Sequence, residues 1–178
     1  MKILVASDIH GSSYYTSKLA NIFNHKNCEQ MVLLGDIYNH GPRNPFPRDY
    51  APMKVAEILN GLKDRLLVIK GNCDSEVEQM ISEFSFVNLG QMVVNNKTIT
   101  FTHGHIFNKD NLPANAGDCL MYGHFHTGFI QKYDNCCVVN PGSIALPKDD
   151  IHSYIIIDNG EIQLWDIEKE EIIKREEL

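Results

Sequence analysis

The sequence predicts an α/β fold, with a parallel sheet in its first half and mostly β-structure in its second half. Residues 2–7 and 30–34 are short apolar runs that end in polar residues, and Leu19, Ile22 and Phe23 lie between them at helical spacing. This order of strand, helix and strand is typical of a βαβ unit, whose two strands are parallel. The first half of the chain is therefore expected to contain a parallel sheet.

The same alternation continues along the chain. The first helix is expected to begin near Ser12 or Ser13, since either hydroxyl can cap it. A second helix is expected over residues 52–62, where Pro52 suits the first turn. Residues 66–69 follow as another buried strand.

After residue 84 the apolar runs are joined by short connections that leave little room for helices. Asn95-Asn96 and Asn159-Gly160, at two of these connections, are typical of hairpin turns. The strands expected in this half are 91–94, 97–102, 119–122, 127–133, 136–139, 153–157 and 161–167.

Three segments fall outside this pattern. Residues 38–50 and 107–118 contain proline and are expected to be long ordered loops, for which a binding role and a variable surface role are both open. The acidic end of the chain, residues 168–177, is expected to be a solvated face or a frayed tail.

Length, charge and cysteine content limit the class of protein. The chain has 178 residues, enough for one hydrophobic core and short for two, so a single domain over residues 1–178 is expected. Its net charge of −7 argues against a broad basic surface for non-specific nucleic-acid binding. No apolar run approaches the roughly 20 residues of a membrane helix and no signal peptide is recognisable, so we expect a cytoplasmic protein. The five cysteines form no CxxC pair and are expected to be free thiols.

Side chains that can bind metal ions follow the expected strands. Parallel α/β sheets bind ligands beyond the carboxyl ends of their strands, so such residues can converge although they are distant in sequence. Side chains two apart on an extended backbone point the same way, which would pair Asp8 with His10, and His124 with His126. The candidate ligands are Asp8, His10, Asp36, Asn72, His103, His124 and His126.

The chemistry of this set favours two metal ions. Imidazole and carboxylate donors suit Mn, Fe and Zn, and the lack of a thiolate argues against a closed structural zinc site. Seven donors suffice for two ions that lie about 3.5–4 Å apart and share a carboxylate, which suits phosphoryl transfer. Taken singly, each Asp can be a helix cap and each His a structural residue, but the joint pattern favours a dinuclear hydrolase.

Five short motifs occur in the order Asp8-x-His10, Gly35-Asp36, Gly71-Asn72-x-Asp74, Thr102-His103-Gly104 and Gly123-His124-x-His126. This order resembles the calcineurin-like metallophosphoesterase superfamily. The segments 35–44, 71–76 and 140–143 further resemble the small bacterial YfcE-type phosphodiesterases. The resemblance implies a metallo-dependent phosphatase-like fold, a four-layered α/β sandwich of two mixed β-sheets flanked by helices.

The resemblance also implies a role for each candidate ligand. One divalent ion would be held by Asp8, His10 and His126, a second by Asn72, His103 and His124, and Asp36 would bridge them. A hydroxide between the ions would attack phosphorus, so Asp36, Asn72 and His103 would act in catalysis through the metals. Manganese is expected first, with Fe, Zn, Ni or Co as alternatives.

Cys73 departs from the pattern of many superfamily members, which carry a His that is thought to assist the leaving group. A thiol is a poorer acid at neutral pH, so a diester with a good leaving group would suffer least. His105 is an alternative proton donor, or a residue that only bonds to the backbone. Asp74 would either support a neighbouring ligand or cap the run that begins at Ser75.

The substrate loop is predicted less directly. Arg43 or His40, in the segment 38–50, would grip the substrate phosphate, with a solvated loop Arg as an equal alternative. We therefore expect a metal-dependent phosphodiesterase acting on a small phosphodiester. A phosphomonoesterase on a small phosphorylated metabolite and a metal-binding interaction scaffold are the alternatives. A homodimer is also compatible with the sequence, which leaves the oligomeric state open.

Overall fold

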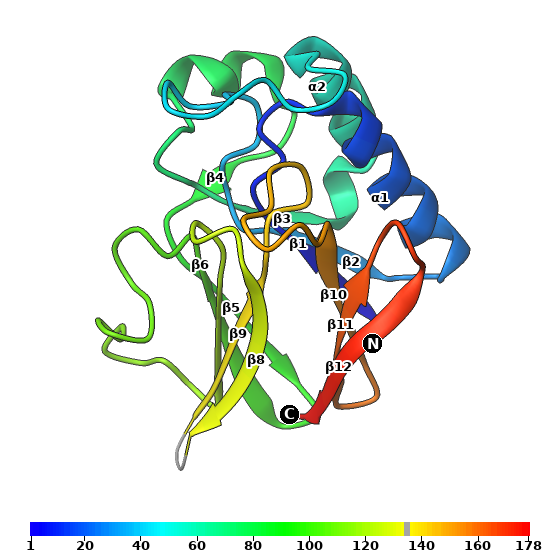
Figure 1. The fold of residues 1–178 in the computed structure, drawn as a ribbon. Helices are drawn as coiled ribbons and strands as arrows, with labels where there is room; N and C mark the ends of the chain where they lie inside the picture. Colours follow the sequence, from blue (N-terminus) through cyan, green and yellow to red (C-terminus); the bar gives the residue numbers. More distant parts are fainter. Residues whose placement is uncertain (134–135) are drawn as a thin grey trace.

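A computed structural model describes residues 1–133 and 136–178, and it contains two mixed β-sheets packed face to face (Figure 1). In the larger sheet seven strands follow the order β12-β11-β10-β1-β2-β3-β4. Its strands are β1 (Ile3–Ala6), β2 (Gln30–Leu33), β3 (Leu66–Ile69), β4 (Phe86–Val87), β10 (Ser153–Asp158), β11 (Glu161–Asp166) and β12 (Glu171–Glu177). β1 to β4 are parallel, as the βαβ pattern predicts, and β10 joins them antiparallel to β1.

The smaller sheet contains five strands in the order β5-β6-β7-β9-β8. They are β5 (Gly90–Val94), β6 (Lys97–Thr102), β7 (Cys119–Tyr122), β8 (Gly128–Tyr133) and β9 (Cys136–Pro141). β6, β7 and β9 run parallel to one another, and β5 and β8 are antiparallel to their neighbours. The expected strands of the second half are all present, and the predicted fold class is confirmed.

Two α-helices cover the outer face of the larger sheet (Figure 1). They are α1 (Ser13–His25) and α2 (Pro52–Asn60), and two short 3₁₀ helices, η1 (Lys63–Arg65) and η2 (Glu76–Ile81), lie in the connections that follow α2. Ser12 caps α1, because its hydroxyl accepts a hydrogen bond from the backbone N–H of Tyr15 at 3.4 Å. Leu19 of α1 and Leu59 of α2 pack against Leu33 in one apolar core.

A second core fills the space between the two sheets. Val5 and Val32 of the larger sheet meet Phe101 and Met121 of the smaller one there. The strands at the centre of the larger sheet are buried on both faces, which explains why their sequences are continuous apolar runs.

A loop covers the outer face of the smaller sheet. Within the described residues, Thr100 and Thr102 of β6 donate hydrogen bonds to the carbonyls of Asn115 and Phe107, at 3.3 and 2.9 Å. This contact places the predicted loop around residues 107–118 against the sheet. In this layer a loop takes the place that a helix would have in a fully helix-flanked sandwich.

The acidic C-terminal segment is a strand with a solvated face, so of the two expectations the solvated face is confirmed and the frayed tail is wrong. β12 pairs antiparallel with β11 along its length and carries mostly exposed, charged side chains. Charged edge strands of this kind resist pairing with other chains. The sequence of this strand shows no clear alternation of apolar and polar residues, because backbone pairing with β11, and not burial of one face, stabilises it.

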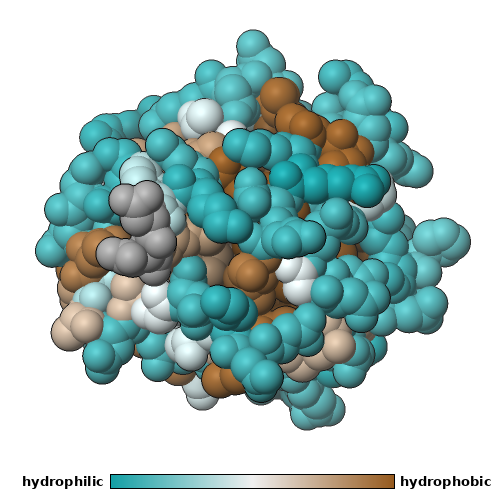
Figure 2. Space-filling view, turned by 90° about the horizontal axis from the view of Figure 1, so that it is seen from below, coloured by the Kyte–Doolittle hydropathy of each residue, from teal (hydrophilic) through white to brown (hydrophobic). Residues whose placement is uncertain are grey.

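The surface facing away from the two helices is mainly hydrophilic. Figure 2 views the molecule from below, where most side chains are hydrophilic and the visible hydrophobic atoms lie in separate areas. Across the described residues, no helix has the length and apolar character needed to cross a membrane.

Candidate metal centre

The predicted ligands lie on loops that follow the parallel strands of both sheets. Asp8 follows β1, Asp36 follows β2, and Asn72 follows β3 in the larger sheet. His103 follows β6, and His124 and His126 follow β7, in the smaller sheet. The carboxyl ends of these strands meet at one edge of the sandwich, which brings the seven residues of the sequence pattern to one place.

Asp8, His10 and His126 form one compact group. The Nε2 atom of His126 lies 3.2 Å from Oδ1 of Asp8 and 3.3 Å from Nε2 of His10. All three side chains are buried, and their ligand atoms lie within 4.8 Å of one another. The group therefore has the residue types and the spacing of a metal site.

The hydrogen bonds of this group leave three lone pairs pointing at one another. The Nδ1 atoms of His10 and His126 donate to the carbonyls of Asn39 and Leu146, at 2.7 and 2.6 Å, so each Nε2 is an acceptor in the neutral ring. Oδ1 of Asp8 is buried, and among the described residues it has no hydrogen-bond partner. Converging acceptors repel unless a cation lies among them, so these residues fit a metal ion.

A second group lies on the other side of Asp36. The Nδ1 atom of His103 donates to the carbonyl of Leu34 at 2.6 Å, and its Nε2 faces Oδ1 of Asn72 at 3.0 Å. This Nε2 also lies 3.5 Å from Oδ1 of Asp36. The ring of His124 is 5.1 Å from that of His103 between centroids. Here too a carbonyl fixes the ring so that Nε2 presents a lone pair to other acceptors.

Asp36 faces both groups. Its Oδ2 atom lies 3.7 Å from Nε2 of His10, while its Oδ1 atom faces His103 and accepts a hydrogen bond from the backbone N–H of Cys73 at 2.8 Å. One carboxylate thus directs one oxygen toward each group, which is the arrangement that a bridging ligand requires.

The candidate ligands do not lie on the extended backbone that the sequence predicts. The φ angles are 56° at Asp8, 49° at His10, 54° at Asp36, 67° at His124 and 61° at His126. A left-handed residue other than glycine costs about 1–2 kcal/mol and persists only where its surroundings fix it. Tight turns, and not strand alternation, aim these side chains inward.

Asp74 holds two ligand loops together. Its carboxylate accepts hydrogen bonds from the backbone N–H groups of Asp36, Ile37 and Gly71, at 2.8, 2.7 and 2.7 Å. The alternative role, a cap for the following helical turn, belongs to Ser75, which forms a capping box. Asp74 is therefore the support of the ligand loops that the sequence left as one of two possibilities.

The charges of the site favour a cation near Asp8. Burial raises the pKa of Asp8, but the adjacent ring of His126 and the charges of the neighbouring histidines hold that pKa below the usual range. Burial lowers the pKa of His126, but the adjacent Asp8 carboxylate more than offsets this effect, and the net change is a rise. Burial and His103 lower the pKa of His124, which keeps this ring neutral, as a metal ligand must be.

Cys73 lies at the site as a protonated thiol. Burial, followed by the charge of Asp36, raises its pKa to about 12. Its ligand atom is also close to those of His10 and Asp36, within 4.8 Å. The sequence predicts a role for Cys73 only at the position of the acid that assists the leaving group. Its proximity to the candidate metal-binding atoms is visible only in the tertiary structure.

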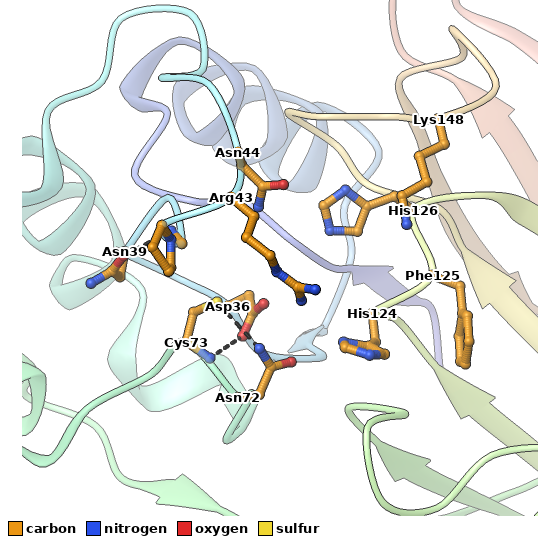
Figure 3. A pocket seen from close by; sticks show the side chains of 12 residues that line it. Asp36, Asn39, Arg43, Asn44, Asn72, Cys73, His124, Phe125, His126 and Lys148 are labelled. Atoms are coloured by element: carbon orange, nitrogen blue, oxygen red, sulfur yellow. Dashed lines mark hydrogen bonds between the residues drawn. The ribbon is translucent and has the colours of Figure 1, made fainter.

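An open cleft of about 760 Å³ lies over the centre (Figure 3). Its lining residues are Asp36, Asn39, Gly41, Pro42, Arg43, Asn44, Asn72, Cys73, His124, Phe125, His126 and Lys148. Arg43 reaches into this cleft, as the sequence suggested (Figure 3). Phe125 and Lys148 also line the cleft, and no sequence pattern indicates them, because a single exposed residue leaves no periodic signal.

Two predicted residues lie away from the main cleft. The ring of His40 packs against Phe46 and Tyr50, at 4.4 and 5.4 Å between centroids. His105 lines a smaller neighbouring cleft together with His103, and their ring centroids are 5.3 Å apart. Of the two substrate candidates only Arg43 lines the cleft over the metal ligands.

The chain also matches the model of a known protein family. The family model of the calcineurin-like phosphoesterase superfamily domain matches residues 1–161. The chain belongs to the calcineurin-like phosphoesterase superfamily. This match and a 42% identical relative named a phosphodiesterase support phosphoester hydrolase activity, and the family implies the use of divalent metal ions. The resemblance predicted from the motifs is confirmed.

Known proteins that are similar to this chain match nearly its full length. The phosphodiesterase YfcE of Escherichia coli strain K12 is 42% identical over 176 residues, which are 97% of this chain and 96% of that protein. The solved structure of the E. coli phosphoesterase YfcE matches with a TM-score of 0.96 and 37% identity, and covers 99% of both chains. Vacuolar protein sorting 29 of Cryptosporidium parvum matches with a TM-score of 0.68 at 15% identity, over 99% of this chain and 97% of that one, and shows the fold alone.

Proposed function

We propose that the protein is a metal-dependent phosphodiesterase that hydrolyses a small phosphodiester at a dinuclear centre. The observation that supports this best is the position of Asp36 between two groups of converging acceptor atoms. Asp8, His10 and His126 would hold one ion, and Asn72, His103 and His124 the other. Manganese is the first choice for both ions, because these nitrogen and oxygen donors suit it.

The side chains of the site have distinct tasks in this proposal. Two bound divalent ions would supply an activated water and would neutralise charge on the phosphoryl oxygens. Asp36 keeps the two positions at a fixed separation, and Asp74 keeps the loops of Asp36 and Asn72 in register. Arg43 extends into the cleft, where its guanidinium can bind a phosphoryl oxygen (Figure 3).

The residue at position 73 supports a diester over a monoester. The thiol of Cys73, whose pKa burial raises to about 12, is a weak proton donor at neutral pH. A diester with a good leaving group needs little help from an acid, whereas an alkyl monoester needs more. The relative that is 42% identical is named a phosphodiesterase, which agrees with this preference.

The setting of the reaction is also part of the proposal. We place the enzyme in the cytoplasm as a single domain, with a small phosphoester as its partner and no general affinity for nucleic acid. A homodimer stays compatible with this setting.

Hydrolysis of two chromogenic substrates tests the proposal. We expect Mn²⁺-loaded protein to cleave bis(4-nitrophenyl) phosphate faster than 4-nitrophenyl phosphate, and a chelator to abolish both activities. Asp36→Asn should lose activity by at least about 100-fold, since it removes the shared carboxylate. Asp64→Asn, a change at an exposed site in η1, is the matched control. Absence of turnover of both substrates by metal-loaded protein would contradict the proposal.

A further inference from the structure

Two loops bring one positive charge each to the cleft. Arg43 lies in the loop after β2, and Lys148 in the loop before β10. Figure 3 shows Arg43 reaching toward Asp36 and Asn72, whereas Lys148 lies at the opposite rim, on the side of His126. The two cations therefore stand on different walls of the cleft.

The loop that carries Arg43 is fixed to the metal ligand His10. The carbonyl of Asn39 accepts a hydrogen bond from Nδ1 of His10 at 2.7 Å. The side chain of Asn39 in turn accepts from the backbone N–H of Gly41 at 2.7 Å, and Asn44 closes the turn with a bond to the carbonyl of Gly41 at 3.2 Å. Arg43 thus begins from a fixed backbone position beside the metal site.

The loop that carries Lys148 is fixed to His126 in the same way. Nδ1 of His126 donates to the carbonyl of Leu146 at 2.6 Å, and the backbone N–H of Lys148 donates to the carbonyl of His126 at 2.9 Å. The hydroxyl of Ser143 accepts from the N–H of Leu146 at 2.8 Å. Two hydrogen bonds therefore fix the Lys148 loop to His126, which belongs to the same candidate metal group as His10.

The charge of Lys148 has no acidic partner within the described residues. Its neighbour Asp149 is engaged elsewhere, because its two oxygens accept hydrogen bonds from the backbone N–H groups of Gly128 and Ile151, at 3.0 and 3.2 Å. The Lys148 ammonium is left to face the cleft and solvent. An unpaired cation anchored at the rim of a substrate cleft attracts negative charge from the ligand.

The reacting phosphate does not account for this cation. A phosphodiester carries a single negative charge at the reacting phosphorus, and the metal positions and Arg43 already face it. Lys148, at the rim, is placed to meet a group on one of the two ester substituents. A neutral substituent would leave this charge without a function in binding.

We propose that Lys148 is a specificity residue for a second anionic group, and that the substrate is a phosphodiester with a further phosphate on one of its alcohol substituents. This inference rests on the proposed function, since it names the substrate class of the same cleft. The second phosphate lies on the wall that carries His126 and binds the Lys148 ammonium through charge-assisted hydrogen bonds.

Two nucleotide diesters that differ by one phosphate test the inference. Thymidine 5′-(4-nitrophenyl phosphate) and its 3′-phosphorylated form release the same 4-nitrophenolate from the same ester bond. We expect a higher kcat/KM for the 3′-phosphorylated substrate, and Lys148→Met should reduce this preference by about 10-fold, the effect of one charge-assisted contact. The preference should also weaken at high salt, because the contact is partly exposed.

A control variant and a binding measurement distinguish failure of the role of Lys148 from failure of the proposed phosphodiesterase function. Lys54→Met removes an exposed cation on α2 that does not line the cleft, and should leave the preference unchanged. Calorimetric titration with thymidine 3′,5′-bisphosphate and thymidine 5′-phosphate measures the subsite without turnover, and Lys148→Met should weaken only the bisphosphate. An unchanged preference together with unchanged bisphosphate affinity would overturn the role of Lys148. Loss of turnover with a retained bisphosphate effect would overturn only the proposed function.

Discussion

Replacement of His126 by Ala is expected to weaken one metal position and leave the other intact. The Nε2 atom of His126 lies 3.2 Å from Asp8 and 3.3 Å from His10. His103 and Asn72 meet on the other side of Asp36, 3.0 Å from each other. Alanine would keep the left-handed backbone at position 126, where φ is already 61°, so the change mainly removes the ligand.

The size of the effect follows from the loss of one ligand. Changes that affect only the support of a ligand weaken metal binding by about 10–100-fold, so loss of the ligand itself should cost about 100-fold or more. Metal at 100 times its dissociation constant stabilises the wild-type protein by about 2.7 kcal/mol, and a 100-fold weaker site would gain only about 0.4 kcal/mol. The difference of about 2.3 kcal/mol corresponds to about 5–9 °C in Tm for a chain of this size.

Metal analysis and thermal unfolding measure this difference. After gel filtration in the presence of Mn²⁺, wild-type protein should retain two ions per chain and His126→Ala about one, and the rise in Tm on metal addition should shrink by the stated amount. His25→Ala, an exposed change at the end of α1, is the matched control. Two ions in His126→Ala at wild-type affinity would refute the assignment of His126, and loss of both ions would refute two separable positions.

Three further changes test other parts of the structure. Cys73→His should raise phosphomonoesterase activity relative to phosphodiesterase activity, because imidazole is a better acid at neutral pH, and equal ratios in both proteins would count against this account. Gly123→Ala should destabilise the fold by about 3 kcal/mol, as chemical denaturation would show, because its Cβ would contact the Ser7 hydroxyl and lie 2.6 Å from Oδ2 of Asp8. Gly61→Ala, at a site with ordinary φ, is its control, and similar losses would exclude the proposed clash. Burial, followed by the charge of Asp74, raises the pKa of Glu78 from 4.5 to about 7. The folded protein therefore binds the proton of Glu78 more tightly than the unfolded chain does. The resulting stabilisation of the metal-free fold is lost as pH rises from about 4.5 through 7. Glu78→Gln should therefore gain about 1 kcal/mol relative to wild type between pH 5 and pH 8, and parallel pH profiles of the two proteins would disprove the shift.

Short local sequence patterns predict most of the helices and strands. Most strands of both sheets, and the start of α1 after its cap Ser12, are encoded in short apolar runs and a capping residue, which depend only on neighbours in the sequence. β12 was missed because pairing with β11 holds it, and such pairing leaves little trace in a charged edge strand. β4, with only two residues, is too short to give a pattern.

The candidate site likewise depends partly on local sequence patterns and partly on contacts between distant segments. The sequence alone determined the class of chemistry, because metal ligands must be specific residue types and must follow the strands that aim them at one edge. Only the tertiary structure decided how the candidate ligands converge, through left-handed turns at residues such as Asp8 and His124, and through Asp74, which accepts hydrogen bonds from two loops. It also placed Lys148 beside His126. These features depend on contacts between segments that are far apart in the chain, and a contact across the fold has no signature in the residues that flank it.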